Sequence, residues 1–411
     1  MNMKKTFKTI FLSLLAAVCA GSFTSCSEDD FGESIFEIPS GNIDKTAYTA
    51  PLDSFVKKCF LMPYNVDFKY KMEDISSDVT KNLVPASYDK CKELAVLIKY
   101  LWYDIYRENV GDGTDEGEIL MKKYSPRIIH LIGSKNVNPN TQTEVLGETS
   151  NGIMITLFRG NTLDVNNLPY CNEYFFQTMH HEFGHMLCSN HVVPTEYRSL
   201  TPGIYDALSW QETSDSVALG QGCISDYSRN NYEDDFVEMY SVFLTSTDQQ
   251  WQARLNTSKW AWEEKEVMYD YWQKLRRNTP KEGLDSIGYL KSVSDKNDGK
   301  CTIIRKIIKR ETVSENEEST VYAHAIPDEE GKIQYLGEGG YDYINTKFGI
   351  LVNYLKEYYN IDIYRLRDAI NKRCYYMDEN GNFELDGNGD VKNRVKDILP
   401  QLLDDLENYN F

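Results

Sequence analysis

The spacing of hydrophobic residues predicts more helix than strand in this chain. Between residues 87 and 109, apolar side chains recur every three or four positions, as on one face of a helix. Similar patterns predict helices over 170–189, 232–243, 251–277, 346–374 and 391–408. Strands are expected over 64–71, 127–132 and 152–159. We therefore expect an α+β fold with a small mixed sheet and a mainly helical second half.

Three polar stretches interrupt this pattern. Residues 201–230 are polar and irregular, and residues 280–345 are charged, contain glycine and predict no definite element. Residues 378–390 have the carboxylate density of a calcium loop, but no register places Gly at position six with Glu at position twelve. Their Asn-Gly pairs favour a hairpin instead.

The first 26 residues are typical of a secretion signal. Lysines precede a short apolar core over 10–20, which is too short to span a bilayer. The segment ends at Phe23-Thr24-Ser25-Cys26, which resembles a bacterial lipoprotein cleavage box with Cys26 as the lipidated residue, although an ordinary signal peptide is the alternative. The acidic run that follows resembles an export tag. We expect an outer-membrane lipoprotein, exposed at the cell surface and tethered by lipid.

The rest of the chain divides into an acidic linker over 27–47, a catalytic domain over 48–290 and a mainly helical C-terminal extension over 291–411. A formal charge of −19 and a pI of about 4.8 argue against nucleic acid as a partner. The seven cysteines beyond Cys26 show no C-x-x-C spacing, so a cysteine metal site is not supported.

Four of the six histidines fall between residues 180 and 191, where the sequence contains H-E-x-x-H. On a helix, His181 and His185 are one turn apart and can direct two imidazoles at one metal ion. Glu182 lies beside them, where its carboxylate can accept a proton from water at the metal. The motif predicts one catalytic zinc ion, which needs a third protein ligand and one open position.

Two residues compete to be that third ligand. His191 has the spacing of the metzincin pattern, but Cys188 stands where that pattern has a glycine that lets the chain turn back. Asp234 lies on the later predicted helix, and Glu238 follows one turn on, where gluzincin-type enzymes place an acidic ligand and a carboxylate that orients a zinc-bound His. We favour Asp234, and His191 remains the alternative.

Tyr227 stands seven residues before Asp234, and its phenol could donate to the oxyanion of a tetrahedral intermediate. The strand over 152–159 precedes the zinc helix, and we expect it to align an extended substrate chain.

The segments 180–187, 225–227 and 234–238 together resemble the zinc-binding metallopeptidases of the Mx1 type, over about residues 50–290. The family has Glu where this chain has Asp234. Members with lipoprotein signals are described as substrate-import-associated zinc metallohydrolases, encoded beside TonB-dependent nutrient transporters. The resemblance implies a zincin-like fold, Tyr227 and Glu238 in the roles above, and cleavage of peptide or protein substrates near an outer-membrane importer.

A non-catalytic zinc-containing lipoprotein that assists nutrient uptake is the rival interpretation. The intact Glu182 favours an enzyme, because a binding protein does not need that base. A hydrolase of other amides or esters would use the same residues.

Overall fold

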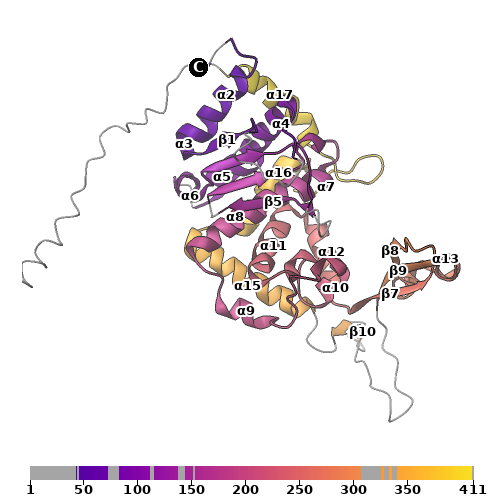
Figure 1. Cartoon of the computed structure of the whole chain (residues 1–411). Helices are drawn as coiled ribbons and strands as arrows, with labels where there is room; N and C mark the ends of the chain where they lie inside the picture. The colour runs from indigo at the N-terminus through magenta and orange to yellow at the C-terminus, as the bar shows by residue number, and fades with distance from the viewer. Residues whose placement is uncertain are drawn as a thin grey trace, which may run out of the picture. The chain divides into compact units, whose positions relative to one another are not determined.

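The computed structural model describes residues 43, 46–72, 83–111, 115–137, 144–150, 153–306, 325–327, 333–335 and 340–409 (Figure 1). The predicted signal peptide, Cys26 and most of the linker lie outside the described residues. The chain forms two compact units, residues 1–53 and 54–411. In the first, the described residues lead into helix α2 (Ala50–Val56). Everything below concerns the second unit.

A four-stranded sheet has the order β1-β2-β6-β5. Strands β1 (Asp67–Lys69), β2 (Ile128–Leu131) and β6 (Met154–Leu157) run parallel, and β5 (Gly147–Ser150) pairs antiparallel with β6. The three predicted strands are confirmed in shorter form, and so is the small mixed sheet.

The expectation that the strand over 152–159 aligns substrate is wrong. Strand β6 is paired on both sides, since Ile155 lies opposite Ile129 of β2 and Thr149 of β5. Its backbone groups are therefore already used within the sheet. The strands at the two edges of the sheet are β1 and β5, and β5 lies next to the helix that carries His181.

The helix predicted over 87–109 is confirmed as a continuous run of α4 (Tyr88–Ile98), η3 (Lys99–Tyr103) and α5 (Asp104–Asn109). The side chain of Ser87 caps its start by accepting a hydrogen bond from the Lys90 amide. Its buried Trp102 packs edge-on against Phe183 of α8, with the ring centroids 5.5 Å apart. This contact joins the first long helix to the zinc-motif helix.

The helix over 170–189 is also confirmed, as α7 (Leu168–Cys171), η5 (Asn172–Phe176) and α8 (Gln177–Asn190). Helix α11 (Tyr232–Thr245) packs closely on α8 (Figure 1). Gly184 makes this closeness possible, because a Cβ there would lie only 2.9 Å from Cβ of Val237. The absence of a side chain at Gly184 therefore lets Val237 of α11 pack directly against the backbone of α8.

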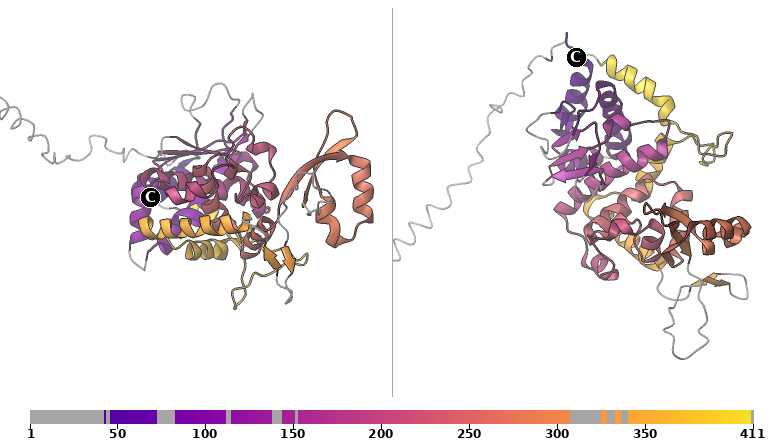
Figure 2. Two further views of the ribbon diagram at one scale, coloured as in Figure 1. Left: turned by 90° about the horizontal axis from the view of Figure 1, so that it is seen from below. Right: turned by 45° about the vertical axis from the view of Figure 1, so that its right-hand side comes forward.

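The prediction of continuous helix over 251–277 is wrong in its middle. Helix α12 (Asp248–Ser258) is followed by strand β7 (Trp262–Met268) and then by α13 (Tyr269–Asn278). Strand β7 pairs with β9 (Lys300–Lys306), which also pairs with β8 (Tyr289–Val293). Helix α13 lies beside this sheet (Figure 2), and its Trp272 packs with Cys301 and Ile303.

Residues of β7 such as Glu and Lys favour a helix locally, but cross-strand pairing overrides that preference. Glu263 pairs with Arg305 at 2.5 Å and Glu266 with Lys300 at 2.5 Å, both across to β9. The partner strand lies in the stretch that predicted no definite element, so the pairing could not be predicted.

The helices predicted over 346–374 and 391–408 are confirmed as α15 (Gly340–Tyr359), α16 (Ile363–Cys374) and α17 (Val395–Glu407). Helices α15 and α16 contact α11, and α17 contacts α4. Lys347 of α15 is fully buried, and its ammonium group lies 2.6 Å from the carboxylate of Asp235. Residues of the C-terminal extension therefore belong to the same compact unit as the zinc-motif helix.

The hairpin interpretation of residues 378–390 is confirmed by antiparallel bridges between Met377 and Phe383 and between Leu385 and Val391. The other described elements are α3 (Met62–Tyr64), η1 (Lys57–Leu61), α6 (Glu116–Tyr124), β3 (Asn136–Val137), β4 (Glu144–Val145), η4 (Gly160–Thr162), α9 (Thr195–Leu200), η6 (Trp210–Glu212), α10 (Asp215–Gly220), η7 (Tyr227–Arg229), η8 (Lys281–Gly283), α14 (Leu284–Ile287), β10 (Ala325–Pro327) and β11 (Ile333–Tyr335).

All seven cysteines beyond Cys26 are free. Within the ranges that the structure describes, no helix has the length and apolar character that a membrane span needs.

Candidate metal centre

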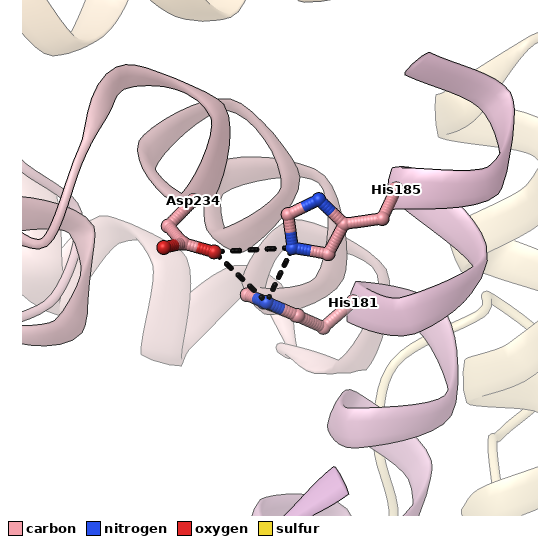
Figure 3. Close-up of side chains that lie close together, drawn as sticks. All are labelled: His181, His185 and Asp234. Atoms are coloured by element: carbon pink, nitrogen blue, oxygen red, sulfur yellow. Dashed lines mark hydrogen bonds and ion pairs between the residues drawn. The ribbon is translucent and has the colours of Figure 1, made fainter. Parts of the chain in front are cut away.

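Three of the predicted ligands lie together where α8 faces the first turns of α11 (Figure 3). Nε2 of His185 lies 3.2 Å from Nε2 of His181 and 3.1 Å from Oδ1 of Asp234. Nε2 of His181 lies 3.6 Å from the same oxygen. Two imidazole nitrogens and one carboxylate oxygen thus form a small triangle.

The spacing of this triangle fits a zinc ion. Zinc binds His nitrogen and carboxylate oxygen at about 2.0–2.2 Å in tetrahedral geometry, so two of its ligand atoms lie about 3.3 Å apart. The three distances here are 3.1, 3.2 and 3.6 Å. The donor set also suits zinc, and three protein ligands leave the fourth position open.

The charges around the triangle favour a positive charge at this place. Burial opposes protonation of His181, but hydrogen bonds with Asp234 and Glu238 outweigh it and raise the pKa of this imidazole to about 10. Burial likewise acts to raise the pKa of Asp234 and of Glu238. Hydrogen bonds with His181 and His185 nevertheless hold the pKa of Asp234 below its usual value, and a hydrogen bond with His181 does the same for Glu238. The ionised carboxylates of Asp234 and Glu238 therefore favour the binding of a cation at this site.

Glu238 orients His181, as predicted for the residue one turn after Asp234. Its Oε1 lies 3.0 Å from Nδ1 of His181, and its Oε2 accepts a hydrogen bond from the Ser225 hydroxyl at 2.8 Å. With Nδ1–H donating to Glu238, Nε2 of His181 is left as the metal-facing nitrogen. Gln177 also donates to this carboxylate, at 3.3 Å.

The structure gives Ser225 and Gln177 roles that the sequence did not reveal. Ser225 stands two residues before Tyr227, inside the segment that carries the family resemblance. This position is the one sequence feature that could have indicated a role for Ser225. Gln177 is the first residue of α8, and nothing in its local sequence marks it.

Glu182 lies on the wall of a cleft of about 950 Å³, together with His181 and Tyr227. The carboxylate is buried, and its Oε2 accepts a hydrogen bond from the hydroxyl of Thr149 on the edge strand β5. A Cβ at Gly147 would lie 3.2 Å from Oε1 of Glu182, so β5 runs close to this residue. Thr149 was missed because the short strand that carries it has no recognisable pattern.

Tyr227 lies at the start of η7, beside the first of the predicted ligands. Its ring centroid lies 5.5 Å from that of His181 and 4.8 Å from that of Trp210, which also lines the cleft. Burial and the charge of Asp234 raise the pKa of the Tyr227 phenol above its usual value. The hydroxyl is therefore a protonated donor at neutral pH.

His191 does not join the triangle. Its ring stacks on Tyr358 with centroids 4.3 Å apart, and its backbone carbonyl accepts a hydrogen bond from Tyr354. Cys188 stays within α8 and His191 continues in an extended conformation, so the chain makes no left-handed turn there. Between the two candidates for third ligand, the geometry favours Asp234.

His180 points away from the cleft. It is fully buried, and its Nδ1 lies 2.9 Å from the hydroxyl of Tyr106 on α5. Burial lowers the pKa of His180 to about 3, so this imidazole is neutral and contributes to packing between helices.

Comparison with known proteins identifies a family for this chain. The family model described as "Putative zinc-binding metallo-peptidase" matches residues 45–364, which extends past the expected limit near 290 and includes α15. A crystal structure of a "putative zinc-binding metallo-peptidase" from Bacteroides caccae ATCC 43185 is similar in fold, with a TM-score of 0.52 and 24% sequence identity, covering 79% of this chain and 92% of that chain. A search of curated proteins found no match.

Proposed function

We propose a function for this chain on the premise that it belongs to the family of zinc-binding metallo-peptidases, whose model matches residues 45–364. The chain acts as a zinc-dependent peptidase with a zincin-like catalytic centre. One zinc ion is held by His181, His185 and Asp234. The observation that carries this proposal is the spacing of these three ligand atoms, which suits a tetrahedral ion, next to a cleft lined by His181 and Glu182.

Zinc in this position supplies Lewis acidity toward a carbonyl oxygen and lowers the pKa of water to about 7. Glu182 accepts the proton of the attacking water and passes it to the leaving amine. The phenol of Tyr227 donates a hydrogen bond to the oxyanion of the tetrahedral intermediate. Glu238 holds the ring of His181 in place throughout.

The edge strand β5 is the element best placed to align substrate. Among the described residues, no strand pairs with its outer side, and an extended peptide can add to such an edge through main-chain hydrogen bonds. Thr149 on β5 also holds the carboxylate of Glu182. Substrate binding and the catalytic base therefore depend on the same strand.

The sequence features at the start of the chain support a location for this activity. We propose an outer-membrane lipoprotein, anchored through Cys26 and exposed at the cell surface, that cleaves peptide or protein nutrients close to an importer. The signal-like segment and the family resemblance support this part of the proposal. No nucleic-acid partner is expected.

The test uses the soluble fragment 27–411 with its metal content measured, assayed on a mixed peptide library beside Glu182→Gln. We expect equal zinc in both proteins and a loss of about 10²–10⁴-fold in cleavage rate for the variant, because the amide cannot accept the proton. Equal zinc without cleavage by either protein would contradict the peptidase proposal and favour the non-catalytic zinc-containing lipoprotein.

A second comparison tests the ligand set through zinc content alone. Asp234→Ala should lose metal, whereas His191→Ala should retain it. The reverse result would make His191 the third ligand.

A further inference from the structure

The two oxygens of the Asp234 carboxylate have separate partners. Oδ1 faces His181 and His185, whereas Oδ2 accepts hydrogen bonds from the side-chain amides of Asn230 and Asn231, the latter at 2.6 Å. Neither asparagine belongs to the H-E-x-x-H motif or to the pair of acidic residues on α11. Both asparagines nevertheless contact the predicted ligand Asp234 directly and so form part of the metal centre.

We propose that Asn230 and Asn231 are positioning residues that restrict Asp234 to binding the metal through one oxygen. This inference rests on the proposed function, because it needs a zinc ion between Asp234 and the two histidines. A carboxylate oxygen has about two lone-pair sites, and two amide donors fill those of Oδ2. A carboxylate that bound through both oxygens would occupy the position that a catalytic zinc keeps open for water.

Amides suit this task because they donate without adding charge. A lysine or arginine in their place would neutralise the charge that Asp234 offers to the cation. The terminal torsion of an aspartate side chain is broad and roughly two-fold, so an unheld carboxylate can rotate. Asp234 is 5% exposed, and water therefore has little access to replace the amides.

The local fold fixes both asparagines. Asn231 is the N-cap of α11, where its Oδ1 accepts hydrogen bonds from the amides of Glu233 at 2.8 Å and Asp234 at 3.0 Å. The Asn231 side chain thus hydrogen-bonds both the backbone amide and the carboxylate of Asp234. Asn230 ends η7, where its backbone amide donates to the carbonyl of Tyr227 at 2.9 Å. The short turn that joins η7 to α11 therefore positions the phenol of Tyr227, the amides of the two asparagines and the ligand Asp234.

Two substitutions of Asn231 in the full-length protein separate its two roles. Asn231→Ser keeps an oxygen that can cap α11 but removes the amide, and Asn231→Ala removes both. We expect both variants to bind zinc about 10-fold more weakly than wild type in competition with a chelator, as is typical when a partner of a ligand is lost. Only Asn231→Ala should also lower Tm.

Two further variants complete the design. Asn230→Ala should weaken zinc binding by a similar factor. Asp362→Ala is the matched control, because Asp362 caps α16 by accepting the amides of Tyr364 and Arg365 far from the metal along the chain. It should lower Tm without changing zinc affinity. In wild type, bound Co²⁺ should show the strong visible absorption of four-coordination, and the asparagine variants should show weaker absorption.

The possible results lead to different conclusions. Wild-type zinc affinity in both Asn231→Ser and Asn230→Ala would overturn the inference while leaving the zinc site intact. A loss in Asn231→Ala but not in Asn231→Ser would also overturn it, since capping alone would then explain the effect. Absence of zinc binding by the wild-type protein would instead refute the proposed function.

Discussion

Replacing Gly184 by alanine tests whether the close packing of α8 on α11 sets the metal geometry. A Cβ at position 184 would lie 2.9 Å from both Cβ and Cγ1 of Val237 and 3.3 Å from Cδ1 of Tyr240. Carbon atoms pack at about 3.5–4.0 Å, so the new methyl group needs about 0.6–1.1 Å more space than the interface provides. The helices must separate, or the side chains of α11 must move.

Two opposing effects determine the change in stability. Alanine is favoured over glycine inside a helix by about 1 kcal/mol, whereas overpacking costs about 1–3 kcal/mol. The free energy of unfolding should therefore fall by about 0–2 kcal/mol. Zinc affinity should change more than the free energy of unfolding, because α8 carries His181 and His185 and α11 carries Asp234. Even a small separation lengthens the distance of 3.1 Å between His185 and Asp234, and we expect zinc affinity to fall about 10-fold.

The assay combines chelator competition for zinc affinity with chemical denaturation for stability. The matched control is Gly349→Ala on α15, where a Cβ would meet nothing within 4 Å. This control should gain about 1 kcal/mol and bind zinc as wild type does. Adding Val237→Ala to Gly184→Ala should restore part of the zinc affinity, because it removes the Cγ1 contact. Unchanged zinc affinity in Gly184→Ala would refute the argument that packing at this glycine sets the ligand spacing.

Three other predictions concern the metal and the buried charges. Glu238→Gln should weaken zinc binding about 10–100-fold in chelator competition, because an amide is a poorer acceptor for Nδ1–H of His181; wild-type affinity would contradict this orienting role. Lys347→Met should lower the free energy of unfolding by about 3–5 kcal/mol in denaturant, because it leaves Asp235 buried and unpaired; a smaller loss in the double variant with Asp235→Asn would support this cause. Removing zinc with a chelator should lower Tm, since a ligand at a hundredfold excess over its Kd stabilises by about 2.7 kcal/mol; an unchanged Tm would argue against zinc binding by the folded chain.

The part of the site that could be predicted from sequence is the part that depends on helix periodicity. His181 and His185 share one face because residues four apart always do, and the same rule paired Asp234 with Glu238. The preference for Asp234 over His191 drew on the missing glycine at Cys188, and in the structure α8 continues through that residue. Local rules were sufficient wherever the relevant neighbours are one turn apart.

The features that were missed depend on contacts between distant segments. Strand β7 has helix-favouring residues, and only its pairing with β9 makes it extended. Similarly, β6 could not be recognised as an inner strand before β5 was known, and β5 has no hydrophobic alternation to reveal it. The amides on Asp234 are close in sequence, but a hydrogen bond to the second carboxylate oxygen depends on side-chain directions that sequence spacing does not specify.

The buried contact between Lys347 and Asp235 has a consequence for the order in which the protein assembles. Asp235 is the neighbour of the ligand Asp234, and its cationic partner arrives 112 residues later in the chain. A growing chain already contains both histidines and Asp234 before that partner is synthesised. Until α15 docks, the ligand helix carries an uncompensated carboxylate at a position that is fully buried in the finished protein. We therefore expect α11, with Asp234, to reach its final position only after α15 has docked.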